Sequence, residues 1–162
     1  MQISKMTAVS GKAFYEITLH EVGRDPQFGW IAPKHFENST TEGVGDDAAS
    51  WGVDGVRKKK FHNSRESNYR IKWHEGDTIG MAADLDRGTL TVGHNGKFRT
   101  MWRKISTPRK PGDPKETPLK IDGGLAPGLS GSDGIVCTLN TGQKVRVNVS
   151  ERIFRVKNQM TK

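Results

Sequence analysis

Residues 76–97, GDTIGMAADLDRGTLTVGHNGK, decide the fold. Apolar side chains recur there at every second position, at Ile79, Met81, Ala83 and Leu85, and then at Leu90 and Val92. A period of two is that of a half-buried strand and not of a helix. The turns Asp86-Arg87-Gly88 and Asn95-Gly96 supply residues that tolerate the positive φ of tight hairpins. The stretch therefore predicts antiparallel strands joined by short turns, with Asp84, Asp86 and Gly88 as turn formers.

The composition favours a single all-β domain. The chain has 162 residues, 33% of them apolar, and 19 glycines. That length supports one domain with a modest core, and the many glycines indicate many turns. About eight to ten short strands at regular spacing, without an internal repeat or a three-turn helix, predict a β-sandwich.

Charge and cysteine content bear on the possible binding partners and on the cellular compartment. The net charge of +8 suits nucleic acid, an anionic membrane surface or an acidic protein, without choosing among them. One cysteine, Cys137, excludes an internal disulfide framework and is compatible with a reducing compartment. Residues 1–11 show no apolar signal segment, and no run approaches the roughly 18 apolar residues of a membrane span. We therefore expect an intracellular location, cytoplasmic or nuclear, and no membrane span.

The expected organisation is one domain with short flanking segments. Residues 1–10 are an N-terminal edge that could be truncated, residues 11–156 form the domain, and residues 157–162 are a basic tail. A basic, proline-containing insert is expected at 104–121. Strands are expected at 12–19, 28–32, 51–53, 69–73, 98–102, 135–140 and 144–149, with a loop at 63–68.

Several motifs resemble known sites but lack their required context. Residues 43–48, GVGDDA, match a dinucleotide-binding loop by letter, yet a strand and not a helix follows them. Asp84 begins an apparent calcium loop, but its sixth and twelfth positions hold Thr89 and Asn95. The five histidines show no metal-ligand spacing. Cys137 lies in an apolar strand and is expected to be a core residue. We therefore expect no catalytic site, no metal and no cofactor.

The basic run at residues 57–60 is ambiguous. Together with Phe61, Tyr69 and Trp73 it could form a basic face with aromatic residues for single-stranded nucleic acid. Alternatively it is a solvated edge strand whose lysines prevent pairing with other chains. A second basic stretch, residues 99–120, contains seven Lys or Arg and two acidic residues.

Seven segments in order resemble the SPRY domain, which is also the core of the B30.2 module. They are GKAFYEI (11–17), FGW (28–30), GDD with SWGVDG and KFH (45–62), Tyr69 with Trp73 and GDTIG (76–80), DLD with NGK (84–97), LAPGLS (125–130) and VRVN (145–148). Each match is weak alone, but seven in register are hard to obtain by chance. The resemblance implies a bent antiparallel β-sandwich of the concanavalin-like jelly-roll type, without substantial helix. It also implies a non-catalytic module that binds a protein or peptide, as an adaptor does, through loops at one rim.

Transferring family positions residue by residue gives a candidate rim site. Phe61 matches an aromatic residue that contacts bound peptide in some members, and residues 130–134 match a second contact loop. The candidate set is Arg24, Asp25, Gln27, Asp46, Asp47, Lys60, Phe61, His62, Tyr69, Ser130, Ser132 and Asp133. The second loop lacks the Val-Trp pair of members that bind Asn-rich peptides, so that ligand is not expected. The insert at 104–121 and His94 also depart from the family pattern.

Three binding functions remain open at this stage. Binding of a protein or peptide is the expected one, with the chain as part of a larger protein or complex. Binding of nucleic acid or another anionic surface through residues 57–60 and 99–120 is the alternative. Carbohydrate binding rests on analogy with lectin sandwiches alone.

Overall fold

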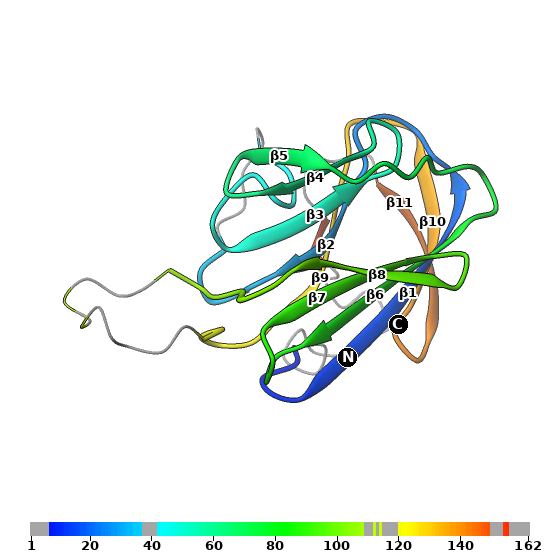
Figure 1. The fold of residues 1–162 in the computed structure, drawn as a ribbon. Helices are drawn as coiled ribbons and strands as arrows, with labels where there is room; N and C mark the ends of the chain where they lie inside the picture. The colour runs from blue at the N-terminus through cyan, green and yellow to red at the C-terminus, as the bar shows by residue number, and fades with distance from the viewer. Residues whose placement is uncertain are drawn as a thin grey trace.

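The computed structural model describes residues 7–36, 42–108, 112, 114 and 120–149, together with the backbone of residues 154 and 155. They form two six-stranded antiparallel sheets that pack face to face (Figure 1). The first sheet, in spatial order, contains β11 (Lys144–Val149), β10 (Ile135–Asn140), β1 (Lys12–Glu21), β6 (Thr78–Asp84), β7 (Thr89–His94) and β8 (Lys97–Trp102). The second contains β12 (Phe154–Arg155), β9 (Ala126–Ser130), β2 (Gln27–Ile31), β3 (Ser50–Asp54), β4 (Lys59–His62) and β5 (Arg65–Asn68).

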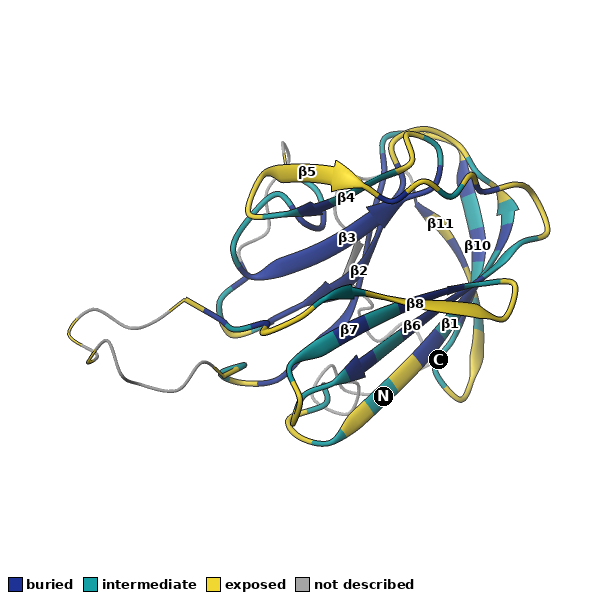
Figure 2. Cartoon of the chain, viewed as in Figure 1, coloured by how far each residue is buried: buried dark blue, intermediate teal, exposed yellow. Residues whose placement is uncertain are grey.

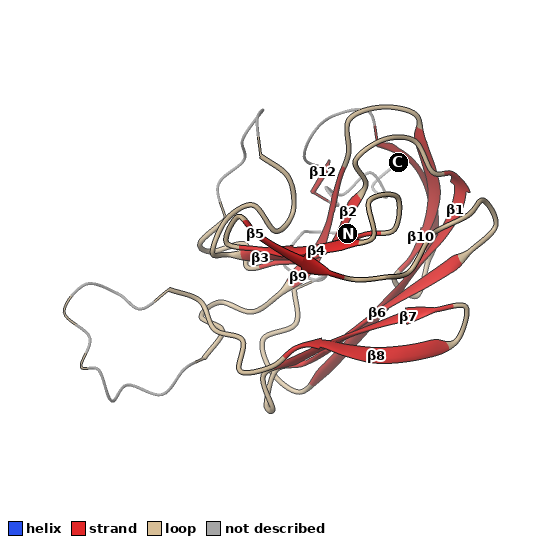
Figure 3. Cartoon of the chain, turned by 45° about the horizontal axis from the view of Figure 1, so that its top comes forward, coloured by secondary structure: helices blue, strands red, loops and turns tan. Residues whose placement is uncertain are grey.

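The predicted all-β sandwich is confirmed. Figure 3 shows only strands and loops in the described part of the chain. Within that part, no helix is long and apolar enough to cross a membrane. Residues 1–6 and the tail at 157–162 lie outside the described residues, as do most residues between 109 and 119 of the predicted insert. The domain boundaries therefore stay predictions.

The core lies between the two sheets, and strands such as β1 and β10 turn every second residue toward it. In β1, Tyr15, Ile17 and Leu19 are buried while Phe14 is half exposed. From the facing sheet, Trp30 meets Tyr15 edge to face at a centroid distance of 5.0 Å. The Tyr15 hydroxyl donates to the Gly29 carbonyl in that sheet, so burial raises its pKa without leaving the group unpaired. Aromatic contacts between the layers thus fix their separation.

The stretch at 76–97 forms the predicted hairpin at the centre of the first sheet. β6 and β7 pair Met81 with Val92 and Ala83 with Leu90. Asn95 and Gly96 both adopt positive φ, at 48° and 86°, as a two-residue hairpin requires. Asp84 accepts a hydrogen bond from the Arg87 amide at 3.0 Å, so it stabilises the turn. The interpretation of these residues as packing positions and turn formers is confirmed.

The prediction for residues 63–73 is wrong. The strand is β5 at Arg65–Asn68, where a loop was expected, and Tyr69–Trp73 lies outside any strand. β5 is an edge strand with four exposed residues, so it has no apolar alternation to reveal it (Figure 2). Tyr69 and Trp73 are buried, and they anchor an irregular segment to the core. Arg70 between them has a φ of 66°, which is not a strand conformation. Their alternation reflects this anchoring and not a strand.

Asp77 holds the start of the central hairpin. Its Oδ2 lies 2.8 Å from His94 Nε2 and accepts a hydrogen bond from the His74 amide at 2.9 Å, while Asn95 Nδ2 donates to its Oδ1 at 3.0 Å. Partial burial alone would raise the pKa of Asp77, but these hydrogen bonds and the nearby histidine hold it below the ordinary value of 3.8. The fold therefore stabilises the ionised form of Asp77.

We expect the stability of the protein to depend on this carboxylate in acid. The pKa of Asp77 is lower in the folded state than in the unfolded state. Its ionised carboxylate therefore contributes fully to folding stability above the unfolded pKa of 3.8, and this contribution is lost as the pH falls through the folded pKa. Asp77→Asn should therefore unfold at a lower temperature than the wild type near pH 7, and the difference should shrink between about pH 4 and about pH 2. Thermal melts over this range, with the exposed Glu75→Gln as control, measure it; a constant difference at every pH would contradict it.

Candidate functional site

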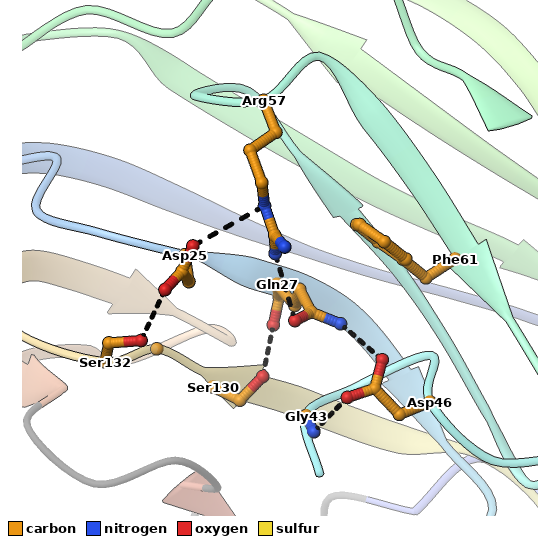
Figure 4. A pocket seen from close by; sticks show the side chains of 9 residues that line it. Asp25, Gln27, Gly43, Asp46, Arg57, Phe61, Ser130 and Ser132 are labelled. Atoms are coloured by element: carbon orange, nitrogen blue, oxygen red, sulfur yellow. Dashed lines mark hydrogen bonds and ion pairs between the residues drawn. The ribbon is translucent and has the colours of Figure 1, made fainter. Parts of the chain in front are cut away.

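A polar hollow of about 230 Å³ opens on the outer side of the second sheet, where β2 begins and β9 ends. Figure 4 shows Asp25, Gln27, Arg57 and Phe61 converging on it from three segments of the chain. The residues that line it are Asp25, Gln27, Gly43, Asp46, Arg57, Phe61, Ser130, Gly131 and Ser132. We refer to this hollow as the rim pocket.

Gln27 is the centre of the rim pocket. Its side chain is buried and uses both ends of the amide. Nε2 donates to the Val44 carbonyl at 2.9 Å and to Asp46 Oδ1 at 3.0 Å, and Oε1 accepts from Arg57 at 3.2 Å. This amide therefore joins the loop before β3 to the turn after it.

Arg57 is held by a fully buried carboxylate. Asp54 Oδ2 accepts from Arg57 Nε at 2.5 Å, and Asp54 Oδ1 accepts from the backbone amides of Val56 and Arg57 at 2.7 and 2.9 Å. The guanidinium lies 4.9 Å from the centroid of the Phe61 ring, a cation–π geometry. Because the Arg57 side chain is still 40% exposed, it presents an oriented cationic edge to a ligand.

A row of three glycines in the second sheet leaves room for the loop before β3, which forms one side of the rim pocket. Gly128, Gly29 and Gly52 are paired across three neighbouring strands. Val44 lies against this row and is fully buried, and a Cβ at Gly52 would come within 2.3 Å of its carbonyl oxygen. Ser130 Oγ accepts from the Val44 amide at 2.9 Å and donates to the Gln27 carbonyl at 3.2 Å. The loop before β3 is therefore fastened to the sheet.

Two loops meet at the mouth of the pocket. Ser132 Oγ donates to Asp25 Oδ2 at 2.6 Å, and Asp25 Oδ1 lies 3.6 Å from Arg57 Nε. The Arg24 amide donates to the Asp133 carbonyl at 2.9 Å, and the Ser132 amide donates to the Arg24 carbonyl at 3.1 Å. These bonds set the distance between the first loop and the loop after β9.

The pocket carries binding chemistry. Two carboxylates, from Asp25 and Asp54, lie beside one guanidinium, a third from Asp46 lies beside Gln27, and one aromatic ring supplies apolar surface. Every carboxylate is already hydrogen bonded, so the pocket is organised before a ligand arrives. Among the described residues, no group of three or more His, Cys, Asp or Glu side chains is arranged to hold a metal ion. Such a site suits a polar side chain or the backbone of a peptide.

Of the twelve sequence-predicted residues, six line the pocket: Asp25, Gln27, Asp46, Phe61, Ser130 and Ser132. Arg24 and Asp133 pair with each other beside its mouth. The structure therefore brings eight of these candidates to one place.

The other four predicted residues lie elsewhere. Asp47 accepts from Ser50 Oγ at 2.6 Å and shapes the loop, and the His62 ring stacks on Trp51 at 4.8 Å. Tyr69 is in the core. Lys60 points away from the pocket: its Nζ donates to the Met101 carbonyl at 2.6 Å, and burial lowers its pKa. Because neighbours in a strand face opposite sides, Lys60 and Phe61 cannot share one pocket.

Sequence reasoning missed Arg57 as a pocket residue, because it was assigned to the basic run at 57–60. The available signal was Asp54 three residues earlier, across a turn whose length allows the two side chains to pair. The structure also divides that run: Arg57 enters the pocket and Lys60 turns to the opposite face. The run is therefore not one continuous basic surface.

The chain was compared with models of known protein families. The model described as SPRY domain matches residues 12–111. The match includes β1 to β8 and every pocket residue up to Phe61, while Ser130, Gly131 and Ser132 follow it in the sequence.

Proposed function

Since the match covers more than half of its residues, the chain belongs to the SPRY domain family, and we propose that it binds a peptide segment of a partner protein in the rim pocket. SPRY domains generally serve as protein-interaction modules and are typically non-catalytic. The peptide ligand and the position of its site are the parts that this proposal adds.

The observation that carries the proposal is the buried connection from Asp54 through Arg57 to Gln27. It orients a half-exposed cation over an aromatic ring before any ligand is present. A site organised in advance loses less conformational freedom on binding, which favours affinity from a small surface. The guanidinium can donate to a peptide carbonyl oxygen, and the Asp25 carboxylate at the mouth can accept from a peptide N–H.

The test selects peptides from a random library displayed on phage and measures their affinity by calorimetry. Asp25→Ala and Ser132→Ala each remove one side of the hydrogen bond at the mouth, and we expect each to weaken binding by about tenfold. Asp25 is exposed and Ser132 is partly exposed, so Ser132→Ala should change the melting temperature little, while Asp25→Ala should lower it slightly because alanine is disfavoured at the Asp25 φ of 52°. Lys144→Ala on β11, in the other sheet, is the matched surface control. Unchanged affinity in both rim variants would refute the rim pocket as the site.

Three broader expectations stay predictions: an intracellular location, the domain limits at 11–156, and a place within a larger protein or complex. Burial raises the pKa of the Cys137 thiol to about 12, so this cysteine is unreactive and says little about the compartment. Imaging of a tagged chain tests the location, and limited proteolysis followed by mass spectrometry tests the limits.

A further inference from the structure

β8 is an open edge of the first sheet. It pairs with β7 on one side, and no other strand among the described residues pairs with its outer side. Lys97, Phe98, Arg99 and Thr100 are all exposed, and most of the strand is drawn in the colour of exposed residues in Figure 2. An exposed edge of this kind can accept an additional strand.

The register identifies which backbone groups of β8 face outward. The Asn95 amide donates to the Thr78 carbonyl in β6 at 2.9 Å. Alternate residues of β7 bond to opposite neighbours, so His94 and Val92 bond toward β8, where their partners are Lys97 and Arg99. Phe98 and Thr100 therefore direct their N–H and C=O groups away from the sheet. Beyond them, the Met101 carbonyl is already occupied by Lys60.

The two faces of β8 differ in chemistry. Lys97 and Arg99 are two residues apart and lie on one face, while Phe98 and Thr100 lie on the other. Phe98 is 49% exposed and forms a pair with Phe14, which is 51% exposed, at a centroid distance of 6.1 Å. The Phe98 ring lies over Gly80 and Gly93, since a Cβ at either glycine would come within 3 Å of it. The edge therefore has a cationic face and an aromatic face.

The described residues supply no counterions to the charge at this edge. Lys97, Arg99, Arg103 and Lys104 fall within eight residues without an acidic residue among them. None of the four forms an ion pair with a carboxylate among the described residues. Lysine at an edge commonly prevents pairing between sheets, but that role does not account for the exposed Phe98. An acidic strand would neutralise the cations, while a basic or apolar strand would leave them facing like charge or no partner.

We propose that β8 binds an extended segment of a partner protein by strand addition, and that this segment alternates acidic and apolar residues. The acidic side chains face Lys97 and Arg99, and the apolar ones lie on the same face as Phe98. Phe98 and Thr100 supply the backbone hydrogen bonds. β8 lies in the first sheet and the rim pocket lies on the second. A result that refutes one of the two proposals therefore leaves the other unaffected.

The test begins with blocked synthetic peptides measured against the whole chain by fluorescence polarisation. A peptide alternating glutamate and valine should bind, and one of the same composition with its glutamates and valines in separate blocks should bind about tenfold more weakly. N-methylation of alternate backbone amides in one register should abolish binding, and in the other register should leave it unchanged. Equal binding of the alternating and block peptides, or of both methylated forms, would overturn the proposal.

Variants of the chain provide a second route. Arg99→Glu should weaken the alternating peptide by about tenfold, while Lys144→Glu, which changes the net charge equally on the opposite edge strand, should not. Thr100→Pro removes one outward N–H at an edge where proline is tolerated, and should abolish binding with an unchanged circular dichroism spectrum. If Arg99→Glu leaves the peptide affinity unchanged but abolishes binding of a single-stranded RNA oligonucleotide, the edge is a nucleic-acid site and the proposal is wrong.

Discussion

Replacing Trp73 with alanine is expected to lower the free energy of unfolding by about 3–5 kcal/mol. The side chain is 1% exposed and stacks on Phe28 at 5.4 Å. It also lies directly on the backbone of Gly55, where a Cβ would come within 1.9 Å of the ring. Gly55 has no side chain that could fill the space on its side of the ring. The alanine variant should therefore keep most of the cavity that it creates.

Trp73→Ala should also weaken peptide binding at the rim pocket. The Trp73 amide donates to the Gly55 carbonyl at 2.9 Å, and Gly55 lies between Asp54 and Arg57 in the turn after β3. When the ring is removed, this turn loses its inner support, so the peptides selected on the rim pocket should bind more weakly. Urea unfolding gives the change in stability, and calorimetry below the transition gives the change in affinity.

Tyr69→Phe separates packing from hydrogen bonding in this cluster. It removes only the hydroxyl that accepts from Trp73 Nε1 at 3.1 Å, and we expect a loss of about 1–2 kcal/mol. Burial raises the pKa of that hydroxyl to about 12, in keeping with a group inside the core. If Trp73→Ala unfolded at the same urea concentration as Tyr69→Phe, the ring would not carry the packing assigned to it.

Replacing Gly52 with alanine should displace the loop that forms the wall of the rim pocket. A Cβ at this position would lie 2.3 Å from the Val44 carbonyl oxygen, which is a backbone atom and cannot rotate away. β3 cannot retreat, because Gly52 is paired with Gly29 on one side and Phe61 on the other. The loop must lift, at a cost of about 1–3 kcal/mol for the added methyl group, and further loss follows if Val44 becomes exposed.

Hydrogen exchange distinguishes displacement of this loop from general destabilisation. The Val44 amide is bonded to Ser130 Oγ and the Gly45 amide to Ser50 Oγ at 2.7 Å. Both should exchange much faster in Gly52→Ala, while amides of the first sheet keep their protection. Val44→Ala is the matched control, because it removes the packed side chain without forcing the carbonyl away. Retention of both protected amides in Gly52→Ala would show that the loop does not depend on the glycine row.

The sequence predicted most of the framework and named six of the nine residues that line the rim pocket, for different reasons. Strands with one buried face, such as β1 and β7, show a period of two that a single segment displays by itself. The edge strand β5 has no buried face, and the segment after it is anchored by Tyr69 and Trp73 outside any strand, so both were misassigned. The resemblance named Phe61 and the loop after β9, which line the rim pocket, and it also named Lys60, which faces the other way.

What the sequence alone determined is local. Alternating apolar residues and Asn-Gly or Asp-Arg-Gly turns specify strands and hairpins, because burial of one face and positive φ are properties of a few consecutive residues. Only the tertiary structure decided the rim pocket. Ser132 donates to Asp25 across 107 positions of sequence, and Arg57 reaches Gln27 across 30. Such contacts depend on the order of strands in the sheet and on the glycine row that admits Val44. A periodic pattern reports how one segment is buried, and it does not report which distant segment lies beside it.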